Sequence, residues 1–154
     1  MVYYLLAFAI VLVDQFSKFL VVKYMEIGQS IPVLEPVLYL TSHRNRGAAF
    51  GILQGQQTLF AAVTVVVVLG IVYYMRQVRH QRLVATAMAL ILGGAVGNFI
   101  DRVTQGEVVD FVAVWIGSYQ YPIFNVADSA VVVGVVLLFW DVLFGARVHK
   151  SASD

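Results

Sequence analysis

Four long apolar stretches constrain the fold of this chain more than any other feature of its sequence. They occupy residues 2–24, 59–75, 83–100 and 126–144. An α-helix rises about 1.5 Å per residue, so stretches of this kind can cross the roughly 30 Å hydrocarbon core of a bilayer. Composition agrees, because 60% of the 154 residues are hydrophobic and only 12% are charged, unlike a soluble globular domain. We therefore predict an integral membrane protein, mainly α, with four transmembrane helices in a single domain spanning residues 1–154.

The composition also excludes several functions. The net charge is +1 and the Lys and Arg residues are scattered or terminal, which leaves no basic face for nucleic acid. The chain contains no cysteine, so it has no disulfide framework, no thiolate nucleophile and no Cys-ligated metal. We expect no nucleic-acid partner and no cofactor.

The first apolar stretch carries an isolated pair of opposite charges. Asp14 and Lys18 are four residues apart, which places them on one helix face in the order that suits an ion pair. Such a pair is either purely structural or supports an active site nearby. No basic segment precedes the stretch and no small-residue cleavage site follows it, so we expect a transmembrane helix rather than a cleaved signal peptide.

The segment from Met25 to Gln57 is too long to be a simple connector. Val37–Thr41 is rich in β-favouring residues, and the glycines of Gly47–Gly51 allow close backbone approach. We therefore predict short strands at the membrane surface. A loop of this length is commonly a lid or cradle over a pocket. Asn45 is then either a hydrogen-bonding residue for substrate or backbone, or simply part of a turn.

The stretch 93–129 places polar side chains between the last two apolar stretches. Carboxylates beside hydrocarbon are expensive and normally face a protein interior or a wet cavity, which marks them as functional candidates. Counting along the helices places these side chains in one layer at one end of the spans. The polar residues are Asn98, Asp101, Arg102, Asp110, Asn125 and Asp128.

These residues limit the chemistry available. Ser129 has no base nearby, and His43 is the only histidine expected on this side, so a serine nucleophile is disfavoured. We expect no metal because no His-Glu-x-x-His pattern occurs, although a hard cation could bind Asp101, Asp110 and Asp128. What remains is a pair of carboxylates sharing one proton, in which one activates water and the other hydrogen-bonds the scissile carbonyl. This is the chemistry of an aspartic protease.

Each acid also has a purely structural interpretation. Asn125 and Asp128 fit a helix N-cap with an acidic residue in the first turn. Asp101 could pair with the adjacent Arg102 at a helix end, and Asp110 could lie at a turn or strand end. Spacing alone leaves these alternatives open.

Five ordered motifs resemble those of one protein family. They are Asp14-Gln-x-Ser-Lys18, Asn45-x-Gly-Ala-Ala-Phe50, Gly97-Asn-x-x-Asp-Arg102, Val109-Asp-Phe111 and Phe124-Asn-x-Ala-Asp-Ser129. Together they span nearly the whole chain and closely resemble lipoprotein signal peptidase, also called signal peptidase II, a bacterial aspartic membrane protease. The resemblance implies four transmembrane helices with a small outer-face β-cradle.

The resemblance also implies an activity and a role for each motif residue. The substrate is a prolipoprotein whose cysteine carries diacylglycerol, cleavage falls on the amino side of that cysteine, and Asp110 and Asp128 form the catalytic dyad. Arg46 stands where the family more usually has Thr, which affects the polarity of the pocket rim. The residues expected to bind substrate or support the dyad are Asn45, Asn98, Asp101, Arg102 and Asn125, together with Asp14 and Lys18.

The distribution of positive charge predicts an orientation. Five of the seventeen residues in 76–82 and 145–154 are Lys or Arg, against three of the fifty-seven in 25–57 and 102–125. Because cytoplasmic loops carry the excess of Lys and Arg, we expect both termini in the cytoplasm and the acids near the outer face. We expect a monomer, surrounded by lipid, in the bacterial cytoplasmic membrane.

The competing function is a small proton-coupled transporter or channel component in which Asp14, Asp101 and Asp128 form a proton relay. Four short spans with no broken-helix pair and no internal repeat disfavour it. Hydrolysis of a lipidated peptide by the purified protein would distinguish the two, because a transporter would not perform it.

The expected orientation can be tested by cysteine labelling in this Cys-free chain. Gly117→Cys should react with an impermeant thiol reagent in intact cells, whereas Gln81→Cys should react only after the membrane is opened. Labelling at residue 81 in intact cells, with residue 117 protected, would reverse the orientation.

Overall fold

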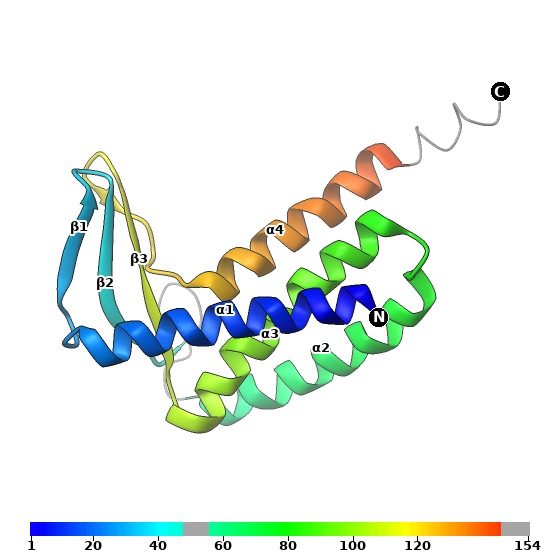
Figure 1. The fold of residues 1–154 in the computed structure, drawn as a ribbon, viewed down its shortest axis with the longest axis horizontal. Helices are drawn as coiled ribbons and strands as arrows, with labels where there is room; N and C mark the ends of the chain where they lie inside the picture. The colour runs from blue at the N-terminus through cyan, green and yellow to red at the C-terminus, as the bar shows by residue number, and fades with distance from the viewer. Residues whose placement is uncertain (48–55, 146–154) are drawn as a thin grey trace.

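The structure, a computed structural model, describes residues 1–47 and 56–145 and consists of a helix bundle with a β-sheet at one end (Figure 1). Four of its helices are long and apolar enough to cross a membrane. The sheet has four antiparallel strands. The helices are α1 (Val2–Tyr24), α2 (Gln57–Val78), α3 (Arg82–Gln105) and α4 (Val126–Trp140), and a π-helical turn follows α4 over Asp141–Gly145. The predicted fold class is therefore confirmed.

The helix boundaries extend two of the predicted spans. The segments that qualify as membrane spans are Val2–Tyr24, Thr58–Val78, Arg82–Gln105 and Val126–Phe144. The second is longer than predicted because α2 continues beyond Met75 to Val78, and the third is longer because α3 continues beyond Ile100 to Gln105. The connection between α2 and α3 is therefore shorter than the predicted loop of residues 76–82. This connection and the start of α1 lie at the end of the bundle opposite the sheet (Figure 1).

The helix α3 lies at the centre of the bundle and contacts each of the other three long helices. Its small residues allow this close approach, as predicted from Gly93 and Gly97. A Cβ atom added at Gly93 would lie 2.7 Å from the carbonyl oxygen of Ala7, and one at Gly97 would lie 2.6 Å from Oδ2 of Asp14. The packing of α1 on α3 therefore leaves no room for larger side chains at these two positions.

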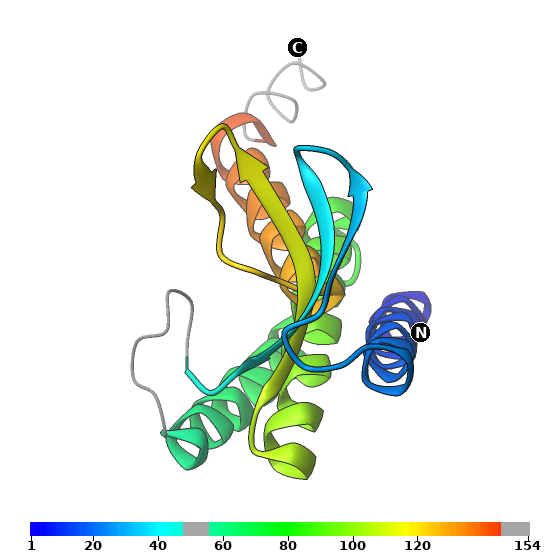
Figure 2. The same ribbon diagram turned by 90° about the vertical axis from the view of Figure 1, so that its left-hand side faces the viewer.

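The sheet joins two segments that are far apart in the chain. Its strands are β1 (Ser30–Leu34), β2 (Leu38–Asn45), β3 (Val108–Ile116) and β4 (Tyr119–Gln120), in spatial order β1-β2-β3-β4. Figure 2 shows the β1–β2 and β3–β4 hairpins side by side, and Figure 1 shows the sheet at one end of the helix bundle. Pairing of β2 with β3 places Asn45 opposite Val108 and His43 opposite Asp110.

The strands predicted between Met25 and Gln57 are confirmed by β1 and β2. The glycine-containing part of that prediction from residue 48 onward lies outside the described residues. The β3–β4 hairpin was not predicted from the sequence. The β-branched run in Val108–Ile116 was a signal for it.

A small apolar cluster fixes the sheet to the helix bundle. Val109 and Phe111 of β3 are buried with Val21 of α1, and partly buried residues of β2 and α4 pack against them. Backbone hydrogen bonds also join Val112 to Phe124, directly before α4. The strand that carries Asp110 is therefore held against the end of the bundle.

Candidate active site

The mouth of the bundle contains a buried ion cluster of Asp14, Lys18 and Asp101. Asp14 and Asp101 are 0% exposed and Lys18 is 2% exposed. Nζ of Lys18 lies 2.8 Å from Oδ2 of Asp14 and 2.8 Å from Oδ2 of Asp101. Charges this deeply buried require partners, because an unpaired ion in the interior costs several kcal/mol. The predicted Asp14–Lys18 pair is therefore confirmed and includes a third member.

The ion-pair partner of Asp101 could not be decided from its position in the sequence. Because Asp101 and Arg102 are adjacent in the sequence, an ion pair between them was one alternative. The carboxylate of Asp101 pairs with Lys18 of α1 instead. Oδ1 of Asp101 also accepts a hydrogen bond of 2.8 Å from Gln15. Neighbouring residues on a helix point in directions about 100° apart, so Asp101 faces α1 while Arg102 faces elsewhere.

The ion cluster also fixes the two elements that carry the other acids. Oδ1 of Asp14 accepts a 2.9 Å hydrogen bond from the backbone nitrogen of Ala127, in the first turn of α4. Oδ2 of Asp101 accepts a 3.2 Å hydrogen bond from the backbone nitrogen of Val109 in β3. Helix N-termini favour negative charge. One buried carboxylate thus positions the start of α4, and the other positions the strand residue that precedes Asp110.

Two asparagines connect the ion cluster with Asp110 and Asp128. The Asn98 amide accepts from Nζ of Lys18 at 2.9 Å and donates to Oδ1 of Asp128 at 2.7 Å. The Asn125 amide donates to Oδ1 of Asp110 at 2.7 Å and to Oδ1 of Asn98 at 3.1 Å. Because an Asn side chain both donates and accepts, the two amides link Lys18, Asp110 and Asp128 in one network.

Asp128 performs the structural role that the sequence suggested. Asn125 is the N-cap of α4, and its side chain accepts a hydrogen bond from the backbone nitrogen of Asp128. In return, Oδ2 of Asp128 accepts from the backbone nitrogen of Asn125 at 3.2 Å, which completes a capping box. The N-cap interpretation is therefore confirmed, and it holds the Asp128 side chain in one orientation.

Asp110 lies in the strand β3 and is almost fully buried. Burial, followed by the negative charge of Asp128, raises the pKa of its carboxyl to about 7, against the opposing effect of hydrogen bonds from Asn45 and Asn125. The Asn45 amide donates to Oδ2 of Asp110 at 3.0 Å. A carboxyl with a pKa near 7 exchanges a proton readily at neutral pH.

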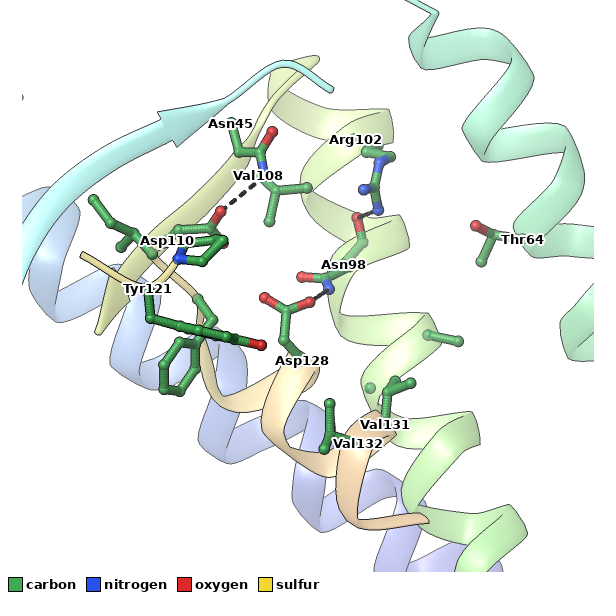
Figure 3. Close-up of a pocket in the computed structure, with 15 residues that line it drawn as sticks. Asn45, Thr64, Asn98, Arg102, Val108, Asp110, Tyr121, Asp128, Val131 and Val132 are labelled. Atoms are coloured by element: carbon green, nitrogen blue, oxygen red, sulfur yellow. Dashed lines mark hydrogen bonds between the residues drawn. The ribbon is translucent and has the colours of Figure 1, made fainter. Parts of the chain in front are cut away.

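Asp110 and Asp128 line the same cavity, whose volume is about 400 Å³ (Figure 3). Figure 3 shows Asp110 and Asn45 on the sheet side, Asp128 on α4, and Asn98 and Arg102 on α3. The deeper wall is apolar and includes Gly94, Ala95, Val131 and Val132, and α2 contributes Thr64. The cavity therefore combines a polar end, where both acids lie, with an apolar end between helices.

Arg102 supplies positive charge to the polar end of this cavity. Its Nη1 donates to the carbonyl oxygen of Asn98 at 3.3 Å, and its guanidinium lies 5.3 Å from the centre of the Phe60 ring. Among the described residues its buried Nε has no hydrogen-bond partner. Such a donor is suited to a carbonyl group of a bound ligand.

All seven residues predicted to support Asp110 and Asp128 lie in this network or line the cavity. Sequence reasoning missed Gln15, whose Nε2 donates to Asp101, to the carbonyl of Gly97 and to Asp14. Gln15 lies next to Asp14 in a polar interruption of an apolar helix, and this position could have indicated that it belongs to the buried network. Nε of Arg46, at the predicted rim, lies 2.9 Å from Oε2 of Glu107.

The geometry does not favour a cation at the acids. Within residues 1–47 and 56–145, no group of three or more His, Asp or Glu side chains is placed to hold a metal ion. Asp101 is already paired with Lys18 and does not line the cavity that Asp110 and Asp128 share.

Neutralising Lys18 should strongly destabilise the protein. In Lys18→Met, the two buried carboxylates lose their shared cation, which we expect to cost about 3–5 kcal/mol of unfolding free energy. Lys23→Met is the matched control on the same helix, because Lys23 is exposed and lies over the rings of Phe19 and Tyr24. Thermal unfolding in detergent measures both, and equal stability of the two variants would contradict the role given to Lys18.

Comparisons with known proteins agree with this site. Residues 6–144 match the family described as "Signal peptidase (SPase) II". A lipoprotein signal peptidase of Halalkalibacterium halodurans is 61% identical over 100% of this chain and 99% of its own length, and one of Bacillus subtilis is 56% identical over 98% and 99%.

Solved structures agree with the fold. Two structures described as bacterial membrane enzymes each give a TM-score of 0.85, at 38% and 41% identity. The first covers 99% of this chain and 91% of its own, and the second covers 92% of both. The five motifs, the buried network and these matches over the whole chain lead to one conclusion: the chain belongs to the signal peptidase II family.

Proposed function

We propose that Asp110 and Asp128 share one proton and together activate the water of the family reaction. As a signal peptidase II, the chain is an aspartic endopeptidase that removes signal peptides from diacylglyceryl-modified prolipoproteins, cutting on the amino side of the lipidated cysteine. The observation that carries the proposal is the position of both carboxyls on one cavity, where each bonds one of two linked asparagine amides.

The shared proton gives each carboxyl a distinct task in the first step. The ionised carboxyl takes a proton from water as the hydroxyl oxygen bonds to the scissile carbonyl carbon, and the protonated carboxyl donates its proton to the carbonyl oxygen. In the second step the proton taken from water passes to the amide nitrogen, the C–N bond breaks, and one hydroxyl of the intermediate returns its proton to the carboxylate that donated one in the first step. The products are the carboxylic acid of the signal peptide and the free amine of the cysteine.

The capping role of Asp128 supports this chemistry. The carboxyl accepts hydrogen bonds at both oxygens, from Asn98 and from the backbone of Asn125, so its rotamer is fixed before substrate binds. A preorganised side chain loses little conformational freedom during the reaction. The same residue can therefore cap α4 and act on water.

The remaining cavity residues have separable roles. Asn45, Asn98 and Asn125 orient the two acids through the hydrogen bonds described above. Arg102, with its unsatisfied Nε, is placed to bind a backbone carbonyl of the substrate. Asp14, Lys18 and Asp101 lie beneath the cavity and act through the residues they position.

The orientation and assembly complete the proposal. We place both acids at the outer face of the cytoplasmic membrane and both termini in the cytoplasm, because Lys and Arg are concentrated in residues 76–82 and 145–154 of the sequence, and the connection between α2 and α3 lies at the end of the bundle opposite the sheet. Tyr119 and Tyr121 are 55% and 45% exposed and suit the headgroup region. The chain acts as a monomer in contact with lipid, since both acids come from one chain.

The dyad is tested by single and double substitutions. Because residues that act as a unit are strongly non-additive, Asp110→Asn, Asp128→Asn and the double variant should each lose about 10³-fold or more in turnover, to a similar residual rate. If Asp128 were only a cap, its loss would cost about 1 kcal/mol of stability and leave turnover nearly intact. The assay is cleavage of a diacylglyceryl-cysteine peptide, with thermal unfolding in detergent as the check on folding. Losses that multiply in the double variant would exclude a shared proton.

The pKa of Asp110 predicts the pH dependence of turnover. The pair is active while it holds one proton, so kcat should fall as pH rises through about 7 and fall again in acid, where both carboxyls are protonated. Because the folded-state pKa is raised, the folded state also loses stability as pH rises from 3.8 to about 7. Unfolding must therefore be measured at each pH, and a kcat that stays flat from about pH 6 to 9 in folded enzyme would contradict the model.

A further inference from the structure

The outer end of α4 separates two hollows. Asp128 and Val132, one helical turn apart, line both the cavity described above and a second groove of about 280 Å³. Val131 lies only on the side of the first cavity, whereas Ser129 and Val133 lie only on the side of the groove. These positions follow from the 100° rotation per residue of an α-helix. The Asp128–Val132 ridge therefore runs between two adjoining sites that share one acid.

The groove faces the hydrocarbon rather than the other helices. Val132 is 59% exposed and Val133 is 50% exposed. Tyr121 and Phe124 border the groove as well as the first cavity, with their rings nearly perpendicular and their centres 6.0 Å apart. A groove lined by valines and aromatic rings, with one acid at its end, is suited to an apolar ligand that begins close to Asp128.

The first cavity differs in shape and composition. It extends from Asp110 and Arg102 down to Gly94, Ala95 and Thr64, on the faces of α3 and α2. The small residue Ala95 allows a peptide helix to approach α3 closely, whereas the space beside Gly94 is filled by Ala127 and Val131 of α4. This cavity is therefore better suited to a polypeptide than to acyl chains.

The chemistry of the substrate requires two such sites. The diacylglyceryl group is attached to the side chain of the cysteine whose backbone nitrogen leaves, so its glycerol lies only a few bonds from the scissile peptide. The signal peptide lies on the other side of that bond. When the scissile carbonyl is at the acids, the peptide and the lipid must therefore leave them in different directions.

We infer that the diacylglyceryl group of the substrate binds in the groove formed by Tyr121, Phe124, Ser129, Val132 and Val133, while the signal peptide occupies the cavity on the Val131 side. This inference rests on the proposed function of Asp110 and Asp128. The glycerol lies at the Asp128 end of the groove, the first segments of the acyl chains occupy the groove along Val133, and the rest of each chain stays in the bilayer. The groove recognises the acyl chains by their shape. An acyl chain is out of contact with water both in the bilayer and in the groove, so the hydrophobic effect contributes little to this binding.

The test compares two lipopeptides that differ only in their acyl chains, one dipalmitoyl and one diacetyl. Val133→Trp fills the groove, so it should raise KM for the dipalmitoyl peptide about tenfold while leaving kcat/KM for the diacetyl peptide within about twofold. Val131→Trp, on the opposite side of the ridge, should impair both peptides by the same factor. Val66→Trp is the control for a lipid-facing tryptophan, because Val66 is 70% exposed and lines neither site.

A second measurement uses the unaltered protein and so does not depend on how the tryptophan variants fold. A dipalmitoyl peptide with a photoreactive group on an acyl carbon next to the glycerol ester should cross-link to Ser129 or Val133. Cross-links to Gly94, Ala95 or Val131 would overturn the inference, as would an unchanged preference for the dipalmitoyl peptide in folded Val133→Trp. Failure of the dyad would appear separately, as retained turnover of the diacetyl peptide in Asp110→Asn.

Discussion

The shared cation of the buried ion cluster is the interaction on which the rest of the structure depends. Lys18 lies between Asp14 and Asp101 at 2.8 Å from each, and the two carboxylates also accept hydrogen bonds from backbone nitrogens of α4 and β3. Removing one member of a buried ion pair leaves an uncompensated charge, so the three residues are interdependent. Through them, a charge on α1 determines where the first turn of α4 and the start of β3 lie. Those are the elements that carry Asp128 and Asp110.

The same arrangement explains why the two acids are held differently. Asp128 is fixed by local geometry, since the capping box involves residues three apart at one helix end. Asp110 depends on contacts over long separations in sequence, with Asn45 on β2 and Asn125 before α4. A pair built in this way can keep one member ionised and one protonated, because their surroundings differ while their charges still interact. The asparagine amides suit this task because they donate to either carboxyl without adding charge.

The sequence predicted most of what depends on local pattern. Apolar length predicted the four spans, and the polar interruptions predicted which residues gather at one end. Strand pairing between distant segments could not be predicted, because no periodicity in the sequence indicates that Asn45 lies opposite Val108 in a sheet. The partner of Asp101 was likewise hidden, because the choice between adjacent Arg102 and distant Lys18 depends on helix rotation and packing. The small residues of α3 indicated close packing, but not that Gly97 makes room for the carboxylate of Asp14.

The position of the acids at the junction of sheet and bundle also follows from the solvent on each side. The two carboxyls share a proton only in a poorly solvated site, yet water must enter that site because it is a reactant. Deep in the bundle water is scarce and unpaired carboxylates are too costly, whereas on the open sheet the two acids would both ionise near their ordinary pKa. At the junction, burial raises the pKa of Asp110 to about 7 while the cavity still opens between sheet and helices. The sheet therefore does more than cover the site. Its strand β3 holds Asp110 at a position that is buried enough to raise the pKa and still open to water.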